Sequence, residues 1–322
     1  MGNRVLNETG ESIFSVVSRR AREAGAVDLG QGYPAYPPPE ALTDALANLE
    51  PRADNHQYAH PHGRPGLRER LAELYRDVHG LSYDVEREIT VTSGATEAIN
   101  AALMGLLNPG DRVVVFEPIY DQYVPVARRA GAEVTVLSLS PEEYSLPLEK
   151  IESTVDDTTD LVLINNPHNP TGSVFRRDSL ETLVNLARAH DVTLLSDEVY
   201  EHLVFEDEKH VPLASLEGAR ERTLTFASAG KSFDATGWKL GWALGPPDLT
   251  ESLRLAHQFT TYCSATPLQG ALEAFLEERK HRSSFKELRE RYAERRELLL
   301  KALEQSSLEP LPMRGSYFLP AR

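Results

Sequence analysis

The chain has 322 residues and a formal net charge of −15, with 41% hydrophobic and 26% charged residues. This length exceeds the usual single-core limit of about 250–300 residues, so we expect one large domain and a smaller one. The acidic balance argues against nucleic acid or an anionic membrane as a partner. A single cysteine, Cys263, excludes an internal disulfide, and the sequence shows neither a signal-peptide core nor a long apolar run. We therefore expect a cytoplasmic protein.

Short apolar runs alternate with amphipathic stretches along most of the chain. After an N-terminal arm and a proline-rich connector, a helix is expected at 40–49. Further helices are expected at 94–107, between the strand at 112–116 and residue 130, at 178–190 and within 252–303. The segment 285–303 has the periodicity of a helix that links two domains. The expected strands are 89–92, 112–116, 133–137, 160–164, 192–196, 223–226 and 240–244. This alternation predicts an α/β fold with a mostly parallel sheet sandwiched by helices, plus a smaller α+β domain.

Polar residues follow four of the expected strands. They are Ser93 with Gly94, then Asn165, Asp197 and finally the run SAGKSF (residues 228–233). Ligands of such sheets bind at the carboxyl ends of the strands, so these residues predict one shared site. The Ser-Gly-Ala-Thr sequence at 93–96 opens a helix, where free N–H groups favour an anion.

Lys231, within the SAGKSF run, is a candidate for covalent chemistry with a carbonyl group, which needs an amine that can lose its proton. Taken alone, a lysine is far more often an ordinary exposed side chain, and only the surrounding motifs favour the covalent role. His56, His60 and His62 are close in sequence, but Pro61 breaks any helix and no carboxylate or cysteine pattern accompanies them. We expect a solvated loop there and no metal.

Seven segments occur in one order: 28–32, 58–59, 92–98, 116–118, 165–172, 196–202 and 228–241. Together they resemble the pyridoxal 5′-phosphate (PLP)-dependent class I/II aminotransferases of fold type I. The resemblance is to the branch of kynurenine, glutamine and methionine aminotransferases. It implies PLP as the cofactor and transfer of an amino group from an L-amino acid to a 2-oxo acid.

The resemblance also implies roles for the catalytic residues. Lys231 would form the Schiff base with PLP and move the proton at the substrate Cα. Asp197 would keep the pyridine nitrogen protonated, so that the ring can act as an electron sink. Tyr200 and Asn169 would bind the phenolic oxygen, and Tyr120 would stack on the ring.

Other residues would bind the phosphate and the substrate. The expected phosphate ligands are Gly94, Ala95, Thr96, Ser228 and Lys239. Tyr58 would reach the phosphate of the neighbouring subunit, which implies a homodimer. Gly32 and Asn169 would place the substrate carboxylate, and an apolar side-chain pocket is expected from Tyr33, Tyr36 and Tyr262.

The expected organisation is an N-terminal arm at 1–36 that joins the small domain, a large PLP-binding domain at 37–280, and a linking helix with an incomplete small domain at 281–322. No arginine after Leu319 fits the carboxylate-binding motif of the family, and Arg322 comes too early. We therefore expect a C-terminal part to be missing. Two alternatives stay open: a cysteine-S-conjugate β-lyase on the same site, and a truncated PLP-binding protein with weak or no turnover.

Overall fold

The computed structural model describes residues 5, 10–32, 36–205 and 208–322. Their strands form one seven-stranded sheet in the order β1-β7-β6-β5-β4-β2-β3. The strands are β1 (Ile89–Thr92), β2 (Arg112–Glu117), β3 (Glu133–Ser138), β4 (Leu161–Asn165), β5 (Thr193–Asp197), β6 (Thr223–Ser228) and β7 (Gly241–Leu244). Each expected strand is present within one or two residues of its predicted bounds.

Strand β7 runs antiparallel to both of its neighbours, β1 and β6, whereas β2 to β6 pair in parallel. Between β6 and β7 the chain holds only the four-residue helix α9 (Ala229–Ser232) and a 3-10 turn, Thr236–Trp238. Without a longer helix to carry it across the sheet, the chain turns straight back. The mostly parallel sheet that the sequence predicts is confirmed, with this one reversal.

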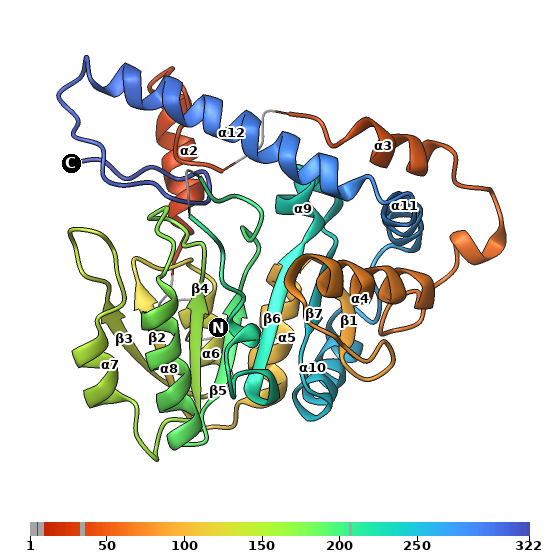
Figure 1. Cartoon of the computed structure of the whole chain (residues 1–322), viewed down its shortest axis with the longest axis horizontal. Helices are drawn as coiled ribbons and strands as arrows, with labels where there is room; N and C mark the ends of the chain where they lie inside the picture. Colours follow the sequence, from red (N-terminus) through yellow and green to blue (C-terminus); the bar gives the residue numbers. More distant parts are fainter. Residues whose placement is uncertain (1–4, 6–9, 33–35, 206–207) are drawn as a thin grey trace.

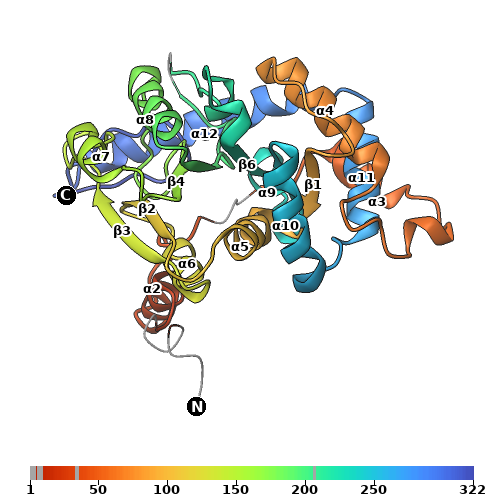
Figure 2. The same ribbon diagram turned by 90° about the horizontal axis from the view of Figure 1, so that it is seen from below.

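Helices cover both faces of the sheet (Figure 2). On one face α5, α6 and α10 pack on alternate strand residues such as Val113 and Val115, and on the other face α7 and α8 pack on Val114 and Phe116. Burial on both faces explains why the strands read as continuous apolar runs. The bounds are α5 (Gly94–Leu106), α6 (Tyr123–Arg129), α7 (Leu148–Thr154), α8 (Arg177–Ala189) and α10 (Pro247–Thr260).

A third apolar cluster lies at the β1–β7 end, where α4 and α11 pack on the sheet. The remaining helices are α2 (Ile13–Glu23), α3 (Glu40–Ala47), α4 (Pro65–His79), α11 (Thr266–Glu277) and α12 (His281–Leu303). Short 3-10 helices occupy Ala53–Asn55, Leu213–Ser215 and Arg220–Arg222. No helix among the described residues combines the length and the apolar character needed to cross a membrane.

Helix α12 crosses the end of the sheet at which α9 follows β6, which is the carboxyl end of the parallel strands (Figure 1). The chain then returns toward the loops that follow β4 and β5. Backbone hydrogen bonds fix it there, from Gly315 N to Gly172 O (2.8 Å) and from Ser316 N to Leu203 O (2.8 Å). The C-terminal residues 304–322 therefore lie beside the strand ends that the sequence marks as a site.

Among the described residues, four helices were not expected, namely α2, α4, α7 and the short α9. The sequence of α4 nevertheless carries clear signals: Pro65 at its first turn, buried Leu67, Leu71 and Leu74 at helical spacing, and Gly80 with a φ of +70° after its end. The helical region expected at 252–303 is present. It is divided among three helices, with Tyr262 in a left-handed conformation between α10 and α11. The division of the chain at residues 36 and 280 stays a prediction.

Candidate active site

A cavity of about 490 Å³ lies at the carboxyl end of the parallel strands. Most of the residues that the sequence marked for the site line it. From the predicted set it is lined by Gly32, Gly94, Ala95, Thr96, Tyr120, Asn169, Asp197, Tyr200, Ser228, Lys231 and Lys239. Its other lining residues include Phe14, Gln31, Ile99, Asn165, Tyr317 and Phe318. The fold thus brings residues from the N-terminal arm, four strand ends and the C-terminal segment to one place.

Lys231 enters this cavity from α9, directly after β6. Burial lowers the pKa of Lys231 to about 8, and the positive charge of Lys239 acts in the same direction, although Asp197 opposes it. A lysine with a lowered pKa carries much more of the neutral, nucleophilic amine near neutral pH. Its Nζ donates a hydrogen bond to the hydroxyl of Tyr317.

Asp197 ends β5 with its side chain buried. Burial raises the pKa of Asp197 to about 6, even though two donors stabilise its carboxylate. Tyr123 Oη donates to Oδ2 at 2.5 Å, and the backbone N–H of Val199 donates to Oδ1 at 3.3 Å. A buried carboxylate of this kind favours a cationic group in the cavity, because a second charge would compensate its lost hydration.

Asn165 connects two of the loops that form the cavity. Its Oδ1 accepts from the backbone N–H of Asn169 at 2.6 Å, and its Nδ2 donates to the carbonyl of Asp197 at 2.8 Å. The bond between Asn169 and Pro170 is cis. These contacts hold Asn169 beside Asp197 at the cavity wall.

The N-terminus of α5 faces the same cavity. Gly94, with a φ of +79°, begins the helix, and Thr96 and Lys239 stand opposite each other, with Lys239 Nζ 3.4 Å from Thr96 Oγ1. The backbone at Gly241 approaches this turn so closely that a Cβ there would lie 2.6 Å from Ala95 N. Free helix N–H groups and a lysine side chain together suit an anionic group.

Sequence reasoning gave no role to Tyr317, which the structure places at the centre of the site. Its hydroxyl accepts from Lys231 and donates to the carbonyl of Gly32 at 2.7 Å, and its ring packs edge-on against Tyr200 with 5.3 Å between centroids. A Cβ at position 32 would lie 2.3 Å from the Tyr317 ring. The motif GSYFL at 315–319 was visible, but its place against Lys231 depends on how the chain returns after α12.

Phe14 was also missed, because the N-terminal arm gave no helix signal that we recognised. It lies on α2, lines the cavity, and its ring centroid is 6.3 Å from that of Tyr120. An aromatic wall of Phe14 and Tyr120 therefore closes one side of the site.

The remaining predicted residues lie outside the cavity lining. Tyr58 is 83% exposed and packs edge-on against Tyr262, 5.6 Å between centroids. Tyr36 lies over the guanidinium of Arg291, and Tyr33 falls outside the described residues. The structure therefore does not bring Tyr36 and Tyr262 together as one side-chain pocket within this chain.

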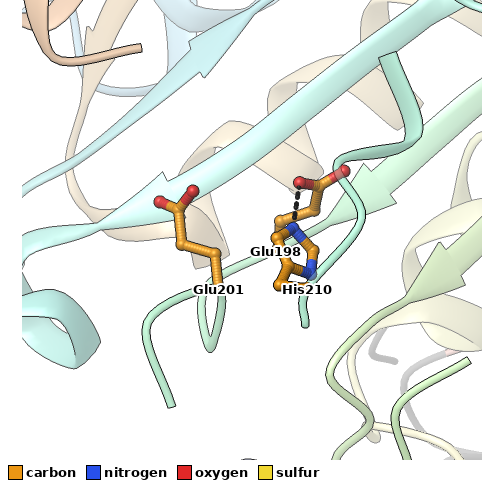
Figure 3. Close-up of side chains that lie close together, drawn as sticks. All are labelled: Glu198, Glu201 and His210. Carbon is orange, nitrogen blue, oxygen red and sulfur yellow. Dashed lines mark hydrogen bonds and ion pairs between the residues drawn. The ribbon is translucent and has the colours of Figure 1, made fainter. Parts of the chain in front are cut away.

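A group suited to a metal ion occurs where the sequence did not indicate one. Ligand atoms of Glu198, Glu201 and His210 lie within 4.8 Å of one another (Figure 3). His210 Nε2 is 2.7 Å from Glu198, and Glu201 is paired with His79 at 2.6 Å. Since these atoms already complete one another's hydrogen bonds, the geometry favours buried ion pairs over metal ligation. His60 and His62 stack edge-on in their loop, 4.6 Å between ring centroids.

Comparisons with known proteins agree on one family. Residues 24–321 match the family model described as aminotransferase class I and II. The chain is 38% identical to the probable N-succinyldiaminopimelate aminotransferase DapC of Mycobacterium tuberculosis over 96% of this chain and 78% of that protein. It is 35% identical to human kynurenine–oxoglutarate transaminase 3, over 96% and 72%. The crystal structure of an Escherichia coli protein with a methionine aminotransferase function superposes with a TM-score of 0.91 at 34% identity, covering 97% of this chain and 82% of that one.

Proposed function

Since this chain belongs to the class I and II aminotransferases, which use PLP, we propose that the cavity beside Lys231 and Asp197 is the site where it transfers amino groups. The family match establishes the reaction class, and the residue roles and substrates below are our proposals. The single observation that supports them most directly is the pairing of a buried, reactive lysine with a buried carboxylate in one cavity.

The donor set of the cavity fits PLP. The start of α5 with Ser228 and Lys239 offers N–H, hydroxyl and ammonium donors for a phosphate. At the other end, the carboxylate of Asp197 suits a protonated ring nitrogen, and Tyr120 suits a flat ring. When bound, PLP supplies a carbonyl that condenses with primary amines and a ring that accepts electrons from the substrate Cα.

With PLP bound, Lys231 would hold it covalently, and its free amine would act as the general base and acid for the proton at the substrate Cα. Tyr317 keeps the amine of Lys231 within the site through its hydroxyl, which the Gly32 carbonyl orients in turn. Tyr200 and Asn169 would donate to the phenolic oxygen of the cofactor, and Gly32 and Asn169 would place the substrate carboxylate.

We assign the substrates to L-amino acids of the methionine, glutamine, kynurenine or aromatic type. Phe14, Ile99, Tyr120 and Phe318 line the cavity with apolar surface, which suits uncharged side chains. Among the described lining residues, the cations are Lys231 and Lys239, and both have other roles here. N-succinyldiaminopimelate, named for the M. tuberculosis relative, is a further candidate donor.

We also propose that a second copy of this chain completes the site. Tyr58 and Phe259 are 83% and 84% exposed, and Leu255 on α10 is 59% exposed. Large apolar and aromatic side chains with this exposure are typical of a surface that another protein covers. Tyr58 would then reach the phosphate of the neighbouring subunit.

The test is an absorbance spectrum of the purified chain with PLP, before and after adding methionine, glutamine, kynurenine or N-succinyldiaminopimelate. Conversion of the cofactor to its amino form with release of the matching 2-oxo acid supports the proposal and identifies the donor. Lys231→Ala should fold and bind PLP but show no turnover; retained transamination by that variant would refute the role of Lys231.

Other results of the same measurement point to the alternatives. Pyruvate from a cysteine conjugate without any added 2-oxo acid would indicate β-elimination, which shares the removal of the Cα proton. A spectrum that no amino acid changes would indicate a PLP-binding protein without turnover.

A further inference from the structure

The turn that follows β5 carries side chains in two directions. Asp197 and Tyr200 line the cavity, whereas Glu198 and Glu201, the residues directly after each of them, are buried away from it. Glu198 is 1% exposed and Glu201 is 4% exposed. Two carboxylates in such a place need partners, because burying an unpaired charge is strongly unfavourable.

Glu198 binds three groups of two neighbouring segments. It pairs with His210 Nε2 at 2.7 Å (Figure 3). It also accepts from Ser196 Oγ at 2.7 Å and from the backbone N–H of Leu213 at 2.9 Å. The side chain of His210 is itself 4% exposed. Glu198 thereby ties the turn to the loop at 210–213.

Glu201 ties the same turn to α4 and β7, and the rings of His79 and His210 lie side by side with 6.1 Å between their centroids. It pairs with His79 Nε2 on α4 at 2.6 Å and accepts from Tyr75 Oη at 3.2 Å, and Tyr75 accepts in turn from Trp242 Nε1 on β7 at 3.1 Å. Burial alone would raise the pKa of Glu201, but His202 and His79 bring it down to about 2. The carboxylate is therefore ionised. His202 lies 3.6 Å from it, but burial lowers the pKa of His202 to about 4, whereas the pKa of His79 is raised by Glu201 despite its burial, so His79 is the partner on which the charge depends.

Between the two carboxylates, two backbone hydrogen bonds fix the chain of the turn. Glu198 N donates to Phe226 O at 2.9 Å, and Glu201 N donates to Glu198 O at 2.9 Å. A carboxylate that lost its histidine would lose the partner of its Oε2, because the other donors named above bind Oε1, and a shift of the carboxylate toward a new partner would pull on this backbone. Asp197 and Tyr200 would move with it, because each is the immediate chain neighbour of one of the glutamates.

We propose that His79 and His210 are positioning residues of the transamination site: by pairing with Glu201 and Glu198 they hold the turn that directs Asp197 and Tyr200 at the cofactor. This inference rests on the proposed function. Neither histidine lines the cavity, so their influence passes through the turn alone. In metal sites, residues that hydrogen-bond to the metal ligands and orient them typically change metal affinity by about 10- to 100-fold. We expect a change in PLP affinity near the lower end of that range here.

The experiment compares His210→Leu and His79→Leu with His210→Gln and His79→Gln in the full chain. Glutamine can place an amide N–H near the position of Nε2, whereas leucine removes the donor. The matched control is His190→Leu, because His190 pairs with Asp157 at a similar 2.6 Å on the surface after α8. Two quantities are measured: the PLP dissociation constant, and amide hydrogen exchange of residues 197–203 in the cofactor-free protein.

We expect the leucine variants to bind PLP about tenfold more weakly and to exchange faster at 197–203, with most of both effects reversed by glutamine. The control should change neither quantity. Leucine variants with unchanged exchange and PLP affinity within about twofold of the wild type would overturn the inference. So would stoichiometric transition metal in the purified protein, since Glu198 and Glu201 would then be ligands.

Two further outcomes are separable. If the leucine variants do not fold, His210→Gln and His210→Asn make the same comparison, because the amide of the shorter asparagine does not extend to the position of Nε2 and cannot reach Glu198. Equal PLP affinity and equal hydrogen exchange in these two variants would overturn the inference. A wild-type chain that fails to bind PLP would refute the proposed function itself. A wild-type chain that binds PLP while its histidine variants behave identically would refute only the positioning role.

Discussion

The substitution Asp197→Asn should stabilise the cofactor-free protein while it weakens PLP binding. Asp197 is buried at the end of β5, where burial raises its pKa to about 6 from a usual value near 3.8. A carboxyl group whose pKa is raised by folding stabilises the native state fully below the unfolded pKa, and this contribution is lost as the pH rises through the folded pKa. The wild-type protein therefore carries an unfavourable charge above about pH 6.

The size of the effect follows from the shift. A change of about two pKa units corresponds to about 3 kcal/mol, at about 1.36 kcal/mol per unit. Asparagine carries no charge to desolvate, and its Oδ1 can still accept the hydrogen bond from Tyr123. Asp197→Asn should thus be up to about 3 kcal/mol more stable than the wild type above about pH 6, and nearly equal to it below about pH 4.

The assay is urea unfolding of the cofactor-free proteins across this pH range, with and without PLP. In the presence of PLP the order should reverse, because the variant lacks the carboxylate that we assign to the ring nitrogen. Equal loss of stability by the variant at every pH would refute the reasoning, since it would mean that Asp197 contributes through hydrogen bonds rather than as a desolvated charge. Tighter PLP binding by the variant would refute its assigned partner.

Two other predictions concern Lys231 and its neighbour. With a pKa of about 8, Lys231 should have ~20% of its amine neutral at a pH of about 7.5, against ~0.1% for an ordinary lysine. Competitive acetylation read by mass spectrometry, with exposed Lys286 as the reference for the reagent, should give a titration midpoint for Lys231 near 8, and this midpoint should fall in Asp197→Asn. A midpoint above about 10 would contradict the argument that burial lowers the pKa. Tyr317→Phe removes the hydroxyl between Lys231 and Gly32. It should lower the free energy of unfolding by about 1 kcal/mol and slow the half-reaction at least about tenfold, while the PLP affinity is retained. An unchanged kcat would show that the hydroxyl has no part in the reaction.

The local signals of the sequence were strong where strands end and helices begin. Every expected strand is present, and the polar residues after β4, β5 and β6 do meet in one cavity. They could be predicted because parallel strands end at one edge of the sheet, so residues far apart in sequence converge there whatever the details of packing. The motifs around Lys231 and Asp197 also indicated the family, which the comparisons confirm.

Other features depend on how distant segments pack. The reversal of β7, the approach of Phe14 on α2 and the return of the chain after α12 have no local signature that fixes their direction. Tyr58 was assigned to the phosphate of a second subunit, and its 83% exposure in this chain leaves that assignment a prediction.

The sequence alone therefore determined the fold class, the cofactor family and most residues of the cavity, because these follow from periodicity and from short motifs at strand ends. Only the tertiary structure decided that Tyr317 meets Lys231, and that His79 and His210 pair with the carboxylates behind Asp197 and Tyr200. Those contacts join residues more than 80 positions apart in one case and 122 in another. These contacts form because the packed chain excludes water, so each buried charged or polar group needs a partner within the protein.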